Sequence, residues 1–171
     1  VEALIGQPAA FRSRTLFQLP AEGIRRIAVV RADGTREAVE REGTVANGWR
    51  PTVPDRQINR VSLDGWLLLL SQVRAERIAA LDTGEAPEHY GLSAPHIEVT
   101  IDLADEDRLR RILIVGGPAP DGGRYAVVRG HDTLYVLGAE TCRQLEQSFL
   151  LPVERSPSAV DPARPPQPEA P

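Results

Sequence analysis

The chain has 171 residues, of which 42% are hydrophobic and 26% are charged, and its formal net charge is −4. These values are typical of one globular domain with a real core, and they exclude a collagen-like or wholly disordered protein. The mild negative charge argues against a nucleic-acid-binding protein, because such a protein normally concentrates basic residues on one face.

The first predicted element is a hairpin. The run from Ile24 to Val30 is rich in β-branched residues, Ala32 to Thr35 supplies a turn with Asp-Gly at its centre, and Arg36 to Glu42 continues as a second strand. Asn47-Gly48 makes another tight turn, which leads into a short third strand that carries Trp49 and is closed by Pro51 and Pro54. An antiparallel sheet is therefore expected to begin here.

The next segment has the period of a helix. Apolar residues recur at spacings of three and four, which is typical of one helical face; they are Leu63, Trp66, Leu67, Leu70 and Val73. Ser62 and Asp55 are both candidates for the N-cap. Gly65 lies inside the pattern and costs about 1 kcal/mol relative to Ala, so the start of the helix stays open.

Alternation returns in the second half of the chain. Residues 97, 99, 101 and 103 are all apolar and polar residues lie between them, which predicts a half-buried strand. The run Leu109 to Val115 predicts a central strand with both faces covered, and Gly116 to Gly123 reads as a loop.

A second hairpin and a second helix follow. Arg124 to Arg129 and Thr133 to Leu137 are predicted as paired strands. A final helix places Cys142, Leu145 and Phe149 on one side, where they can pack on the sheet. The fold class expected is α+β, with antiparallel sheets of short strands and two packed helices.

The chain divides into three parts. Residues 1–15 are expected to be an N-terminal extension, residues 16–151 a single α+β domain, and residues 152–171 a disordered Pro-rich tail or linker, because seven of these last twenty residues are proline. A plain spacer is favoured over a polyproline ligand for such a tail. We find no internal repeat with a fixed short period.

The sequence contains no recognisable catalytic, cofactor or metal motif. His89, His96 and His131 lack the close spacing of a zinc site, and Asp105 to Asp107 lack the alternating ligands of a calcium loop. The glycine-rich loop from residue 116 to 123 precedes a predicted strand and not a helix, which argues against phosphate binding. No catalytic, cofactor-binding or metal-binding residue and no cofactor is therefore assigned, and an enzyme is not expected. A hydrolase whose Ser, His and Asp meet only in space stays an open alternative.

Several residues that attract functional interpretations are expected to be structural. Cys142 is the only cysteine and occupies an apolar helical position, which favours a buried thiol. Trp49, Trp66, Tyr125 and Tyr135 occupy positions that strand or helix packing explains, so the core is expected to contain them.

The order of these signals resembles a bacterial domain of unknown function, the one catalogued under the number 4340. Four pieces carry the likeness: Ile24 to Ile27 with the Asp33-Gly34 turn, Gly48-Trp49 leading to Pro54, the leucine-rich helix followed by Ala75-Glu76-Arg77, and above all Tyr90-Gly91-Leu92-Ser93-Ala94-Pro95. In the family, a Tyr-Gly-Leu-x-x-Pro segment precedes an alternating strand, a strand ending in Gly, and two tyrosine-bearing strands. The similarity covers about residues 16–151.

The resemblance implies proteins tethered by an N-terminal membrane segment, often encoded beside membrane components, with no established catalytic residues. A signal peptide or membrane anchor before Val1 fits this expectation. We therefore expect a non-catalytic accessory or scaffold domain, located on the extracytoplasmic (periplasmic) side of a bacterial envelope. Its expected partners are subunits of a membrane protein complex. The alternative is a cell-envelope module that binds a small molecule or a glycan.

Overall fold

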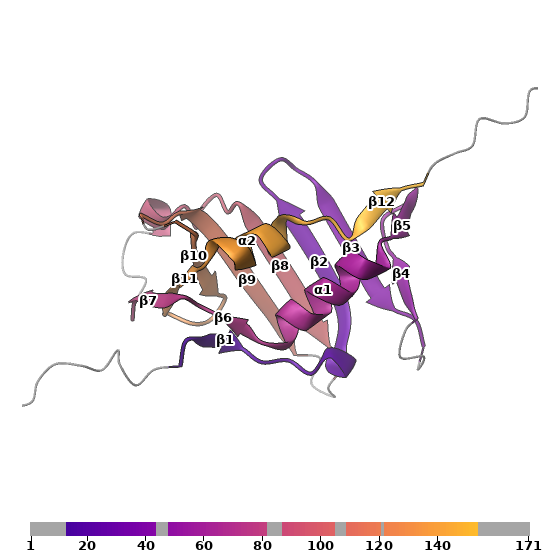
Figure 1. The fold of residues 1–171 in the computed structure, drawn as a ribbon, viewed down its shortest axis with the longest axis horizontal. Coiled ribbons are helices and arrows are strands. Elements are labelled where there is room, and N and C mark those ends of the chain that lie inside the picture. Colours follow the sequence, from indigo (N-terminus) through magenta and orange to yellow (C-terminus); the bar gives the residue numbers. More distant parts are fainter. Residues whose placement is uncertain (1–12, 44–47, 82–86, 105–108, 121, 154–171) are drawn as a thin grey trace, which may run out of the picture.

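Short strands dominate the computed structural model, which describes residues 13–43, 48–81, 87–104, 109–120 and 122–153. Two α-helices and two turns of 3-10 helix lie between them (Figure 1). In chain order the elements are β1 (Thr15–Phe17), η2 (Ala21–Gly23), β2 (Ile24–Arg31), β3 (Arg36–Arg41), β4 (Trp49–Pro51), β5 (Arg56–Ile58), α1 (Arg60–Ser71), β6 (Val73–Arg74), β7 (Arg77–Ala80), η3 (Pro87–Tyr90), β8 (Ile97–Leu103), β9 (Arg110–Pro118), β10 (Arg124–Val128), β11 (Leu134–Leu137), α2 (Ala139–Glu146) and β12 (Leu150–Pro152).

An eight-stranded sheet runs through the centre of the protein in the order β4-β3-β2-β8-β9-β10-β11-β7. Two small two-stranded sheets are formed by β1 with β6 and by β5 with β12. Every pairing among the described strands is antiparallel. The expected antiparallel sheet with two helices is therefore present, and the protein is more strand-rich than the sequence predicts.

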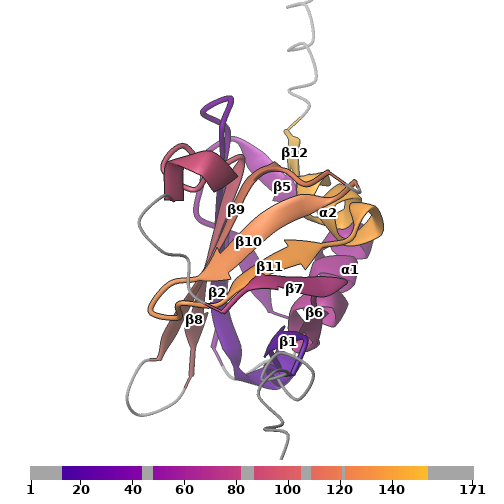
Figure 2. The ribbon, with the colours of Figure 1, turned by 90° about the vertical axis from the view of Figure 1, so that its left-hand side faces the viewer.

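Both α-helices pack on one face of the large sheet (Figures 1 and 2). Alternate strand residues point to this face and are fully buried, such as Val99 on β8 and Leu113 on β9. They form one core with the helix residues Leu63, Trp66 and Leu145. Burial of this face is the main source of stability, since apolar area removed from water contributes roughly 25 cal/mol per Å².

The other face of the sheet carries a row of charges that runs across five strands. Neighbouring positions in the strand registers are Arg50, Glu40, Arg26, Asp102 and Arg110, so the sign alternates along the row. Asp102 lies 2.6 Å from Arg110 and 3.9 Å from Arg26. Each charge in this row has an opposite charge beside it, which is typical of a solvated sheet face.

The two predicted hairpins are confirmed. β2 pairs with β3 and β10 pairs with β11, and β4 adds the short strand expected at Trp49. The alternation from residue 97 to 103 is also confirmed, because β8 has buried and half-buried residues in strict alternation.

The helix prediction needs two corrections. Asn59 caps α1 and its side chain accepts a hydrogen bond from the Ser62 N–H at 3.3 Å, so neither Ser62 nor Asp55 is the N-cap. Val73 does not continue the helix: α1 ends at Ser71, and Val73 is buried on β6. Val73 fits the helical spacing because it lies three positions after Leu70, but it is a buried residue of the strand that follows the helix.

β9, the predicted central strand, is longer than predicted, and one of its two faces is less buried than predicted. β9 continues through Gly116 and Gly117 to Pro118, so the first part of the expected loop belongs to the strand. Leu113 and Val115 are buried, whereas Ile112 and Ile114 are only half-buried because they point to the face without α-helices. The prediction that both faces are covered is therefore wrong for this strand.

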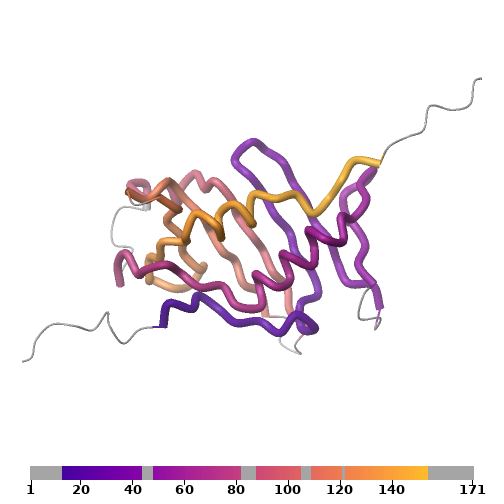
Figure 3. Tube along the Cα trace, in the orientation of Figure 1, coloured from indigo at the N-terminus to yellow at the C-terminus, as the bar shows by residue number. Residues whose placement is uncertain are grey.

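The chain contains two halves with a similar order of elements. Four strands precede a helix in each half, β2 to β5 before α1 and β8 to β11 before α2; β6 and β7 follow α1, whereas β12 alone follows α2 in the described chain. The halves meet at the β2–β8 pair, with β3 and β4 on one side and β9 and β10 on the other (Figure 3). This arrangement has an approximate two-fold axis near the Ala28–Thr100 pair.

The last strand of each half pairs with a strand of the other half. β7, which follows α1, pairs with β11, and β12, which follows α2, pairs with β5. The likeness extends to the helices, since buried residues lie four and seven positions after the N-cap in both: Leu63 and Trp66 after Asn59, and Cys142 and Leu145 after Gly138. Leu70 continues this face in α1, whereas Phe149 is buried but lies beyond the end of α2 at Glu146, so its prediction as a helix residue is wrong. The internal repeat is thus structural, with no short sequence period.

Candidate functional site

An open pocket of about 360 Å³ lies where the β2–β3 hairpin meets the end of α2. Arg31, Ala32 and Asp33 come from the hairpin, His96 precedes β8, and Glu146 is the last residue of α2. The Ala32 N–H donates to the His96 carbonyl oxygen at 3.0 Å, which holds the hairpin tip beside the start of β8. Three distant parts of the sequence therefore build this pocket.

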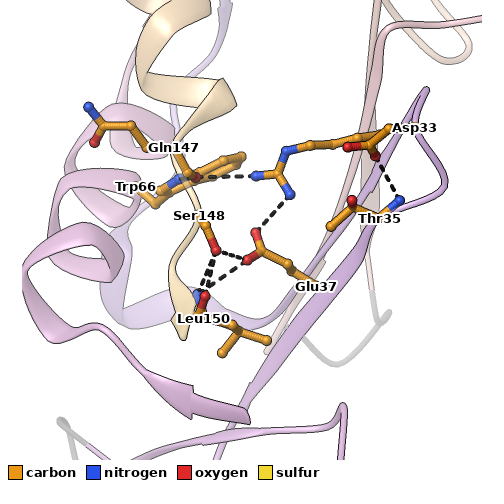
Figure 4. A network of polar contacts seen from close by, with 8 residues as sticks. Asp33, Thr35, Glu37, Trp66, Gln147, Ser148 and Leu150 are labelled. Atoms are coloured by element: carbon orange, nitrogen blue, oxygen red, sulfur yellow. Dashed lines mark hydrogen bonds and ion pairs between the residues drawn. The ribbon is translucent and has the colours of Figure 1, made fainter. Parts of the chain in front are cut away.

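Arg31 is held in the site by a largely buried ion pair. Its Nη1 lies 2.9 Å from Glu37 Oε2, and the two side chains are 12% and 5% exposed. Arg31 Nη2 also donates to the Gln147 carbonyl oxygen at 3.2 Å, which the Trp66 indole N–H contacts at 3.0 Å (Figure 4). Sheet, α1 and the segment after α2 are joined through these groups.

Glu37 also holds the start of β12. Its Oε1 accepts a hydrogen bond from the Ser148 hydroxyl and one from the Leu150 N–H, the latter at 3.3 Å (Figure 4). A buried carboxylate that accepts several hydrogen bonds beside an Arg is well compensated, whereas loss of one partner would be costly. The role of this cluster is to fasten the segment after α2 to the sheet.

His96 and Glu146 form the rim of the pocket. His96 Nε2 lies 2.9 Å from Glu146 Oε1, and the Arg124 Nε lies 3.8 Å from the same oxygen. Across the pocket, the Asp33 carboxylate accepts the Thr35 N–H at 2.8 Å, and hydrogen bonds from Thr35 lower the pKa of the Asp33 carboxyl. Asp33 therefore stays ionised, and the rim offers carboxylate oxygens to a cation or an N–H donor.

The contacts of His96 and Ser148 bear on the hydrolase alternative. Among the described residues, the side-chain partner of His96 is Glu146, while the Ser148 hydroxyl is engaged with Glu37 and the Leu150 carbonyl oxygen. His89 lies in η3 and His131 in the turn between β10 and β11, and both are exposed. The structure therefore does not bring the three histidines together.

The glycine-rich loop closes a tight hairpin. Gly122 and Gly123 have positive φ, and a Cβ at Gly123 would overlap the Leu137 carbonyl oxygen. Glycine is required there for backbone geometry, which agrees with the loop predicted for this end of the glycine-rich segment. Asp105 to Asp107 lie outside the described residues. Within the described ranges, no group of three or more His, Cys, Asp or Glu is placed to hold a metal ion.

The residues expected in the core are largely found there. Trp49, Trp66 and Tyr135 are buried, and Tyr125 is half-buried against Tyr90 with ring centroids 5.0 Å apart. Cys142 is buried, and this burial raises the pKa of its thiol. The predicted structural role of Cys142 is consistent with both observations.

The outward face of α1 is the most exposed apolar surface on a regular element of the described chain. Val61 is 83% exposed and Leu68 is 76% exposed, and Gly65 lies between them on the same face. A Cβ added at Gly65 would meet nothing within 4 Å, so neither packing nor backbone geometry inside the protein requires glycine there. We call Val61, Gly65 and Leu68 the α1 stripe. Sequence periodicity missed it because α1 has apolar residues on more than one side.

Comparison with protein families gave one match. The family model described as "Domain of unknown function (DUF4340)" matches residues 1–95 and 49–164, which together span most of the chain. A search of curated proteins and a search of solved structures each gave no match. In the described part of the chain, neither helix has the length and apolarity needed to cross a membrane.

Proposed function

We propose that this chain, which belongs to the DUF4340 family, is a non-catalytic accessory or scaffold domain that binds another protein in a bacterial membrane-associated complex. The observation that carries the proposal is the α1 stripe. Two large apolar side chains exposed by more than three quarters lie on one helix face and flank Gly65, and apolar residues grouped in this way mark contact sites when polar residues surround them.

Gly65 strengthens this interpretation. Glycine inside a helix costs about 1 kcal/mol relative to Ala, and the open space around Gly65 offers no reason for it within the protein. A partner backbone that approaches α1 closely supplies such a reason, because the absent Cβ lets two backbones come together. The α1 stripe is therefore suited to contact with a protein.

The exposed face of α1 also differs in polarity from the exposed face of α2, the helix beside it. The exposed residues of α2 are mostly polar, and they include Glu140, Arg143, Gln144 and Glu146. α2 thus has the surface of a solvated helix, whereas α1 does not. Binding through α1 is favoured over binding through the helix layer as a whole.

The location that we propose is the extracytoplasmic side of the envelope, with a membrane tether before Val1. Its support is what the family resemblance implies about N-terminal segments. A fusion of the native protein to alkaline phosphatase, which is active only outside the cytoplasm, tests it: phosphatase activity is expected, and an inactive fusion of normal abundance would refute the location.

Binding of a small molecule or glycan is the second candidate, and the pocket of about 360 Å³ is the observation in its favour. Ligand pockets are mostly lined by hydrophobic and aromatic side chains. Four of the five residues that line this one are charged or titratable, namely Arg31, Asp33, His96 and Glu146. The protein-binding role therefore ranks first.

The test is purification of the native protein from membranes in mild detergent, with quantitative mass spectrometry of the proteins that co-purify. Leu68→Asp and Val61→Asp are expected to lose a stoichiometric partner, while Gln144→Asp on α2 is the matched control and retains it. Circular dichroism checks that all three variants fold. A protein that purifies alone, or a partner that survives both α1 substitutions, would refute the proposal.

A further inference from the structure

The two halves of the fold differ in the space between the end of the helix and the start of the first strand. In the first half, residues just before β2 fill this space. Leu19 is 6% exposed, and its N–H donates to the Ser71 carbonyl oxygen at the end of α1, 3.1 Å away. η2 also packs on α1. The chain therefore places a short segment of its own against the end of α1.

In the second half, the equivalent residues take another path. Before β8, Tyr90 packs on Tyr125, and Gly91 lies so close to β9 that a Cβ would be 2.6 Å from the Gly117 nitrogen. Figure 2 shows η3 on the side of the sheet away from α1 and α2. Among the described residues before β8, His96 reaches the end of α2 through its side chain, with Nε2 2.9 Å from Glu146 Oε1, but no buried apolar residue lies there as Leu19 does at the end of α1.

The pocket occupies this uncovered position. At the tip of the β2–β3 hairpin, the Ala32 N–H donates to the carbonyl oxygen of His96 in the other half at 3.0 Å; after β8, the Ala104 N–H donates to the carbonyl oxygen of Gly23 in the first half at 2.8 Å. Both bonds join a hairpin tip to the residue at the start of the neighbouring strand. Because Ala32, His96 and the last residue of α2 line the pocket, it corresponds to the space that the chain itself fills in the other half.

The charges around the pocket favour a basic occupant. Asp33 and Glu146 present carboxylates, and the carboxyl end of α2 adds the negative end of its dipole. The charge of Arg31 is compensated by Glu37 at 2.9 Å. Glu146 Oε1 already contacts His96 Nε2 at 2.9 Å and lies 3.8 Å from Arg124 Nε, so Asp33 at the exposed hairpin tip is the main carboxylate for a basic occupant. A segment with exposed N–H groups and an Arg or Lys side chain is complementary to this surface.

We infer that the pocket at the end of α2 binds a short extended segment of a partner protein, in which a leucine-like residue is followed within a few positions by Arg or Lys. The apolar residue takes the place that Leu19 has in the other half, and the basic residue reaches Asp33 and Glu146. This inference rests on the proposed function, because it gives the same class of partner a second contact, but it does not depend on the α1 stripe.

The experiment is a titration of the isotope-labelled full chain with acetyl-Gln-Leu-Pro-Ala-Arg-amide, followed by amide chemical shifts. This peptide copies Gln18 to Ala21 and has Arg in the position of Glu22. Saturable shifts are expected at Ala32, Asp33, His96 and Glu146. The matching peptide with Glu in the last position is expected to bind about fivefold more weakly, because Asp33 and Glu146 are exposed and exposed ion pairs contribute little.

Three variants locate the binding. Ala32→Trp fills the pocket at an exposed position and is expected to abolish the shifts. The double variant Asp33→Asn with Glu146→Gln keeps hydrogen-bond acceptors but removes both charges, so the Arg peptide should lose its advantage over the Glu peptide. Glu140→Gln, which changes the same charge at the other end of α2, is expected to leave both affinities unchanged.

Several outcomes would overturn the inference: no saturable shift with either peptide, equal affinity for both peptides in the unchanged chain, or shifts centred on α1. Shifts at the pocket that grow with protein concentration before peptide is added would assign the pocket to a second copy of the chain and overturn it as well. Because no partner is used, failure here leaves the co-purification test of the α1 stripe unaffected.

Discussion

Arg31 on β2 and Glu37 on β3 form an ion pair inside the protein, with Nη1 and Oε2 2.9 Å apart. Arg31 also reaches Gln147, and Glu37 reaches Ser148 and Leu150. One pair of charges thus ties the first hairpin to the segment that carries the last described strand.

Replacing Glu37 by Gln is expected to destabilise the protein by about 3 kcal/mol, because it leaves the buried Arg31 charge without a counterion. The matched control is Glu98→Gln, which breaks an exposed pair with Arg129 at 3.1 Å and should cost less than about 1 kcal/mol. Urea unfolding followed by tryptophan fluorescence measures both. Equal losses for the two variants would show that the buried pair has no special role.

Gly65→Ala is expected to raise the free energy of unfolding by up to about 1 kcal/mol, because alanine is the better helix former and its Cβ meets nothing within 4 Å. The same variant should weaken capture of the partner, since it places a methyl group on the α1 stripe. Thermal unfolding and co-purification provide the two readouts. A variant that is less stable would contradict the geometry described for α1.

Gly116→Ala is expected to lower the free energy of unfolding, which is the opposite of the effect expected for Gly65→Ala. A Cβ at Gly116 would overlap the Tyr90 carbonyl oxygen and lie 3.1 Å from the Gly91 carbonyl carbon. Backbone atoms move less easily than side chains, so the overlap should cost about 1–3 kcal/mol. Urea unfolding measures the loss, and Gly65→Ala is the control for an added methyl group in open space. Unchanged stability would mean that Tyr90 and Gly91 are not held against β9.

The Cys142 thiol should make stability fall at alkaline pH. Burial raises its pKa above the ordinary value of 9.0, so above that pH the unfolded chain loses the proton while the folded chain keeps it. The raised pKa therefore stabilises the folded state fully below the ordinary value, and this stabilisation is lost as the pH rises towards the folded pKa. The difference in unfolding free energy between the unchanged protein and Cys142→Ala is expected to be constant below about pH 8 and to decrease above it. An increase there would contradict the burial.

The Asp33 carboxyl is expected to titrate below its ordinary value of 3.8, because the side chain and backbone of Thr35 donate hydrogen bonds to its charged form. The resulting stabilisation of the hairpin tip is present above the ordinary value and is lost as pH falls through the lowered one. Carbon-13 NMR of the carboxyl group measures the pKa directly. Thr35→Val removes the hydroxyl contact and should move the pKa back towards 3.8, and a lower value in that variant would contradict the assignment.

Sequence patterns predicted the parts of the fold that depend on local regularity. β8 was identifiable because its alternation continues for its whole length, and the β2–β3 hairpin because Asp33-Gly34 supplies a turn between two β-branched runs. β5, β6, β7 and β12 have two to four residues each. Strands this short have no readable period, and their pairing is decided by distant partners.

The pocket could not be predicted from local patterns, because its lining residues are brought together only by the fold. His96 stands out in the sequence only as one of three widely spaced histidines, and Glu146 belongs to no motif. One signal was present in the sequence: the apolar spacing of Leu63, Trp66 and Leu70 recurs in Cys142, Leu145 and Phe149. Comparing the two helices would have suggested the duplicated arrangement, and with it the place where the halves differ.

The exchange of last strands between the halves has a consequence for synthesis in the cell. β5 and α1 leave the ribosome early, but β5 pairs with β12, at the far end of the described chain. The first half therefore cannot close until nearly all of that chain has been made, and pairings between such distant segments form slowly. In the meantime the face of α1 that carries Leu63, Trp66 and Leu70 has no β12 segment to cover it. A nascent chain of this kind is a natural client of chaperones.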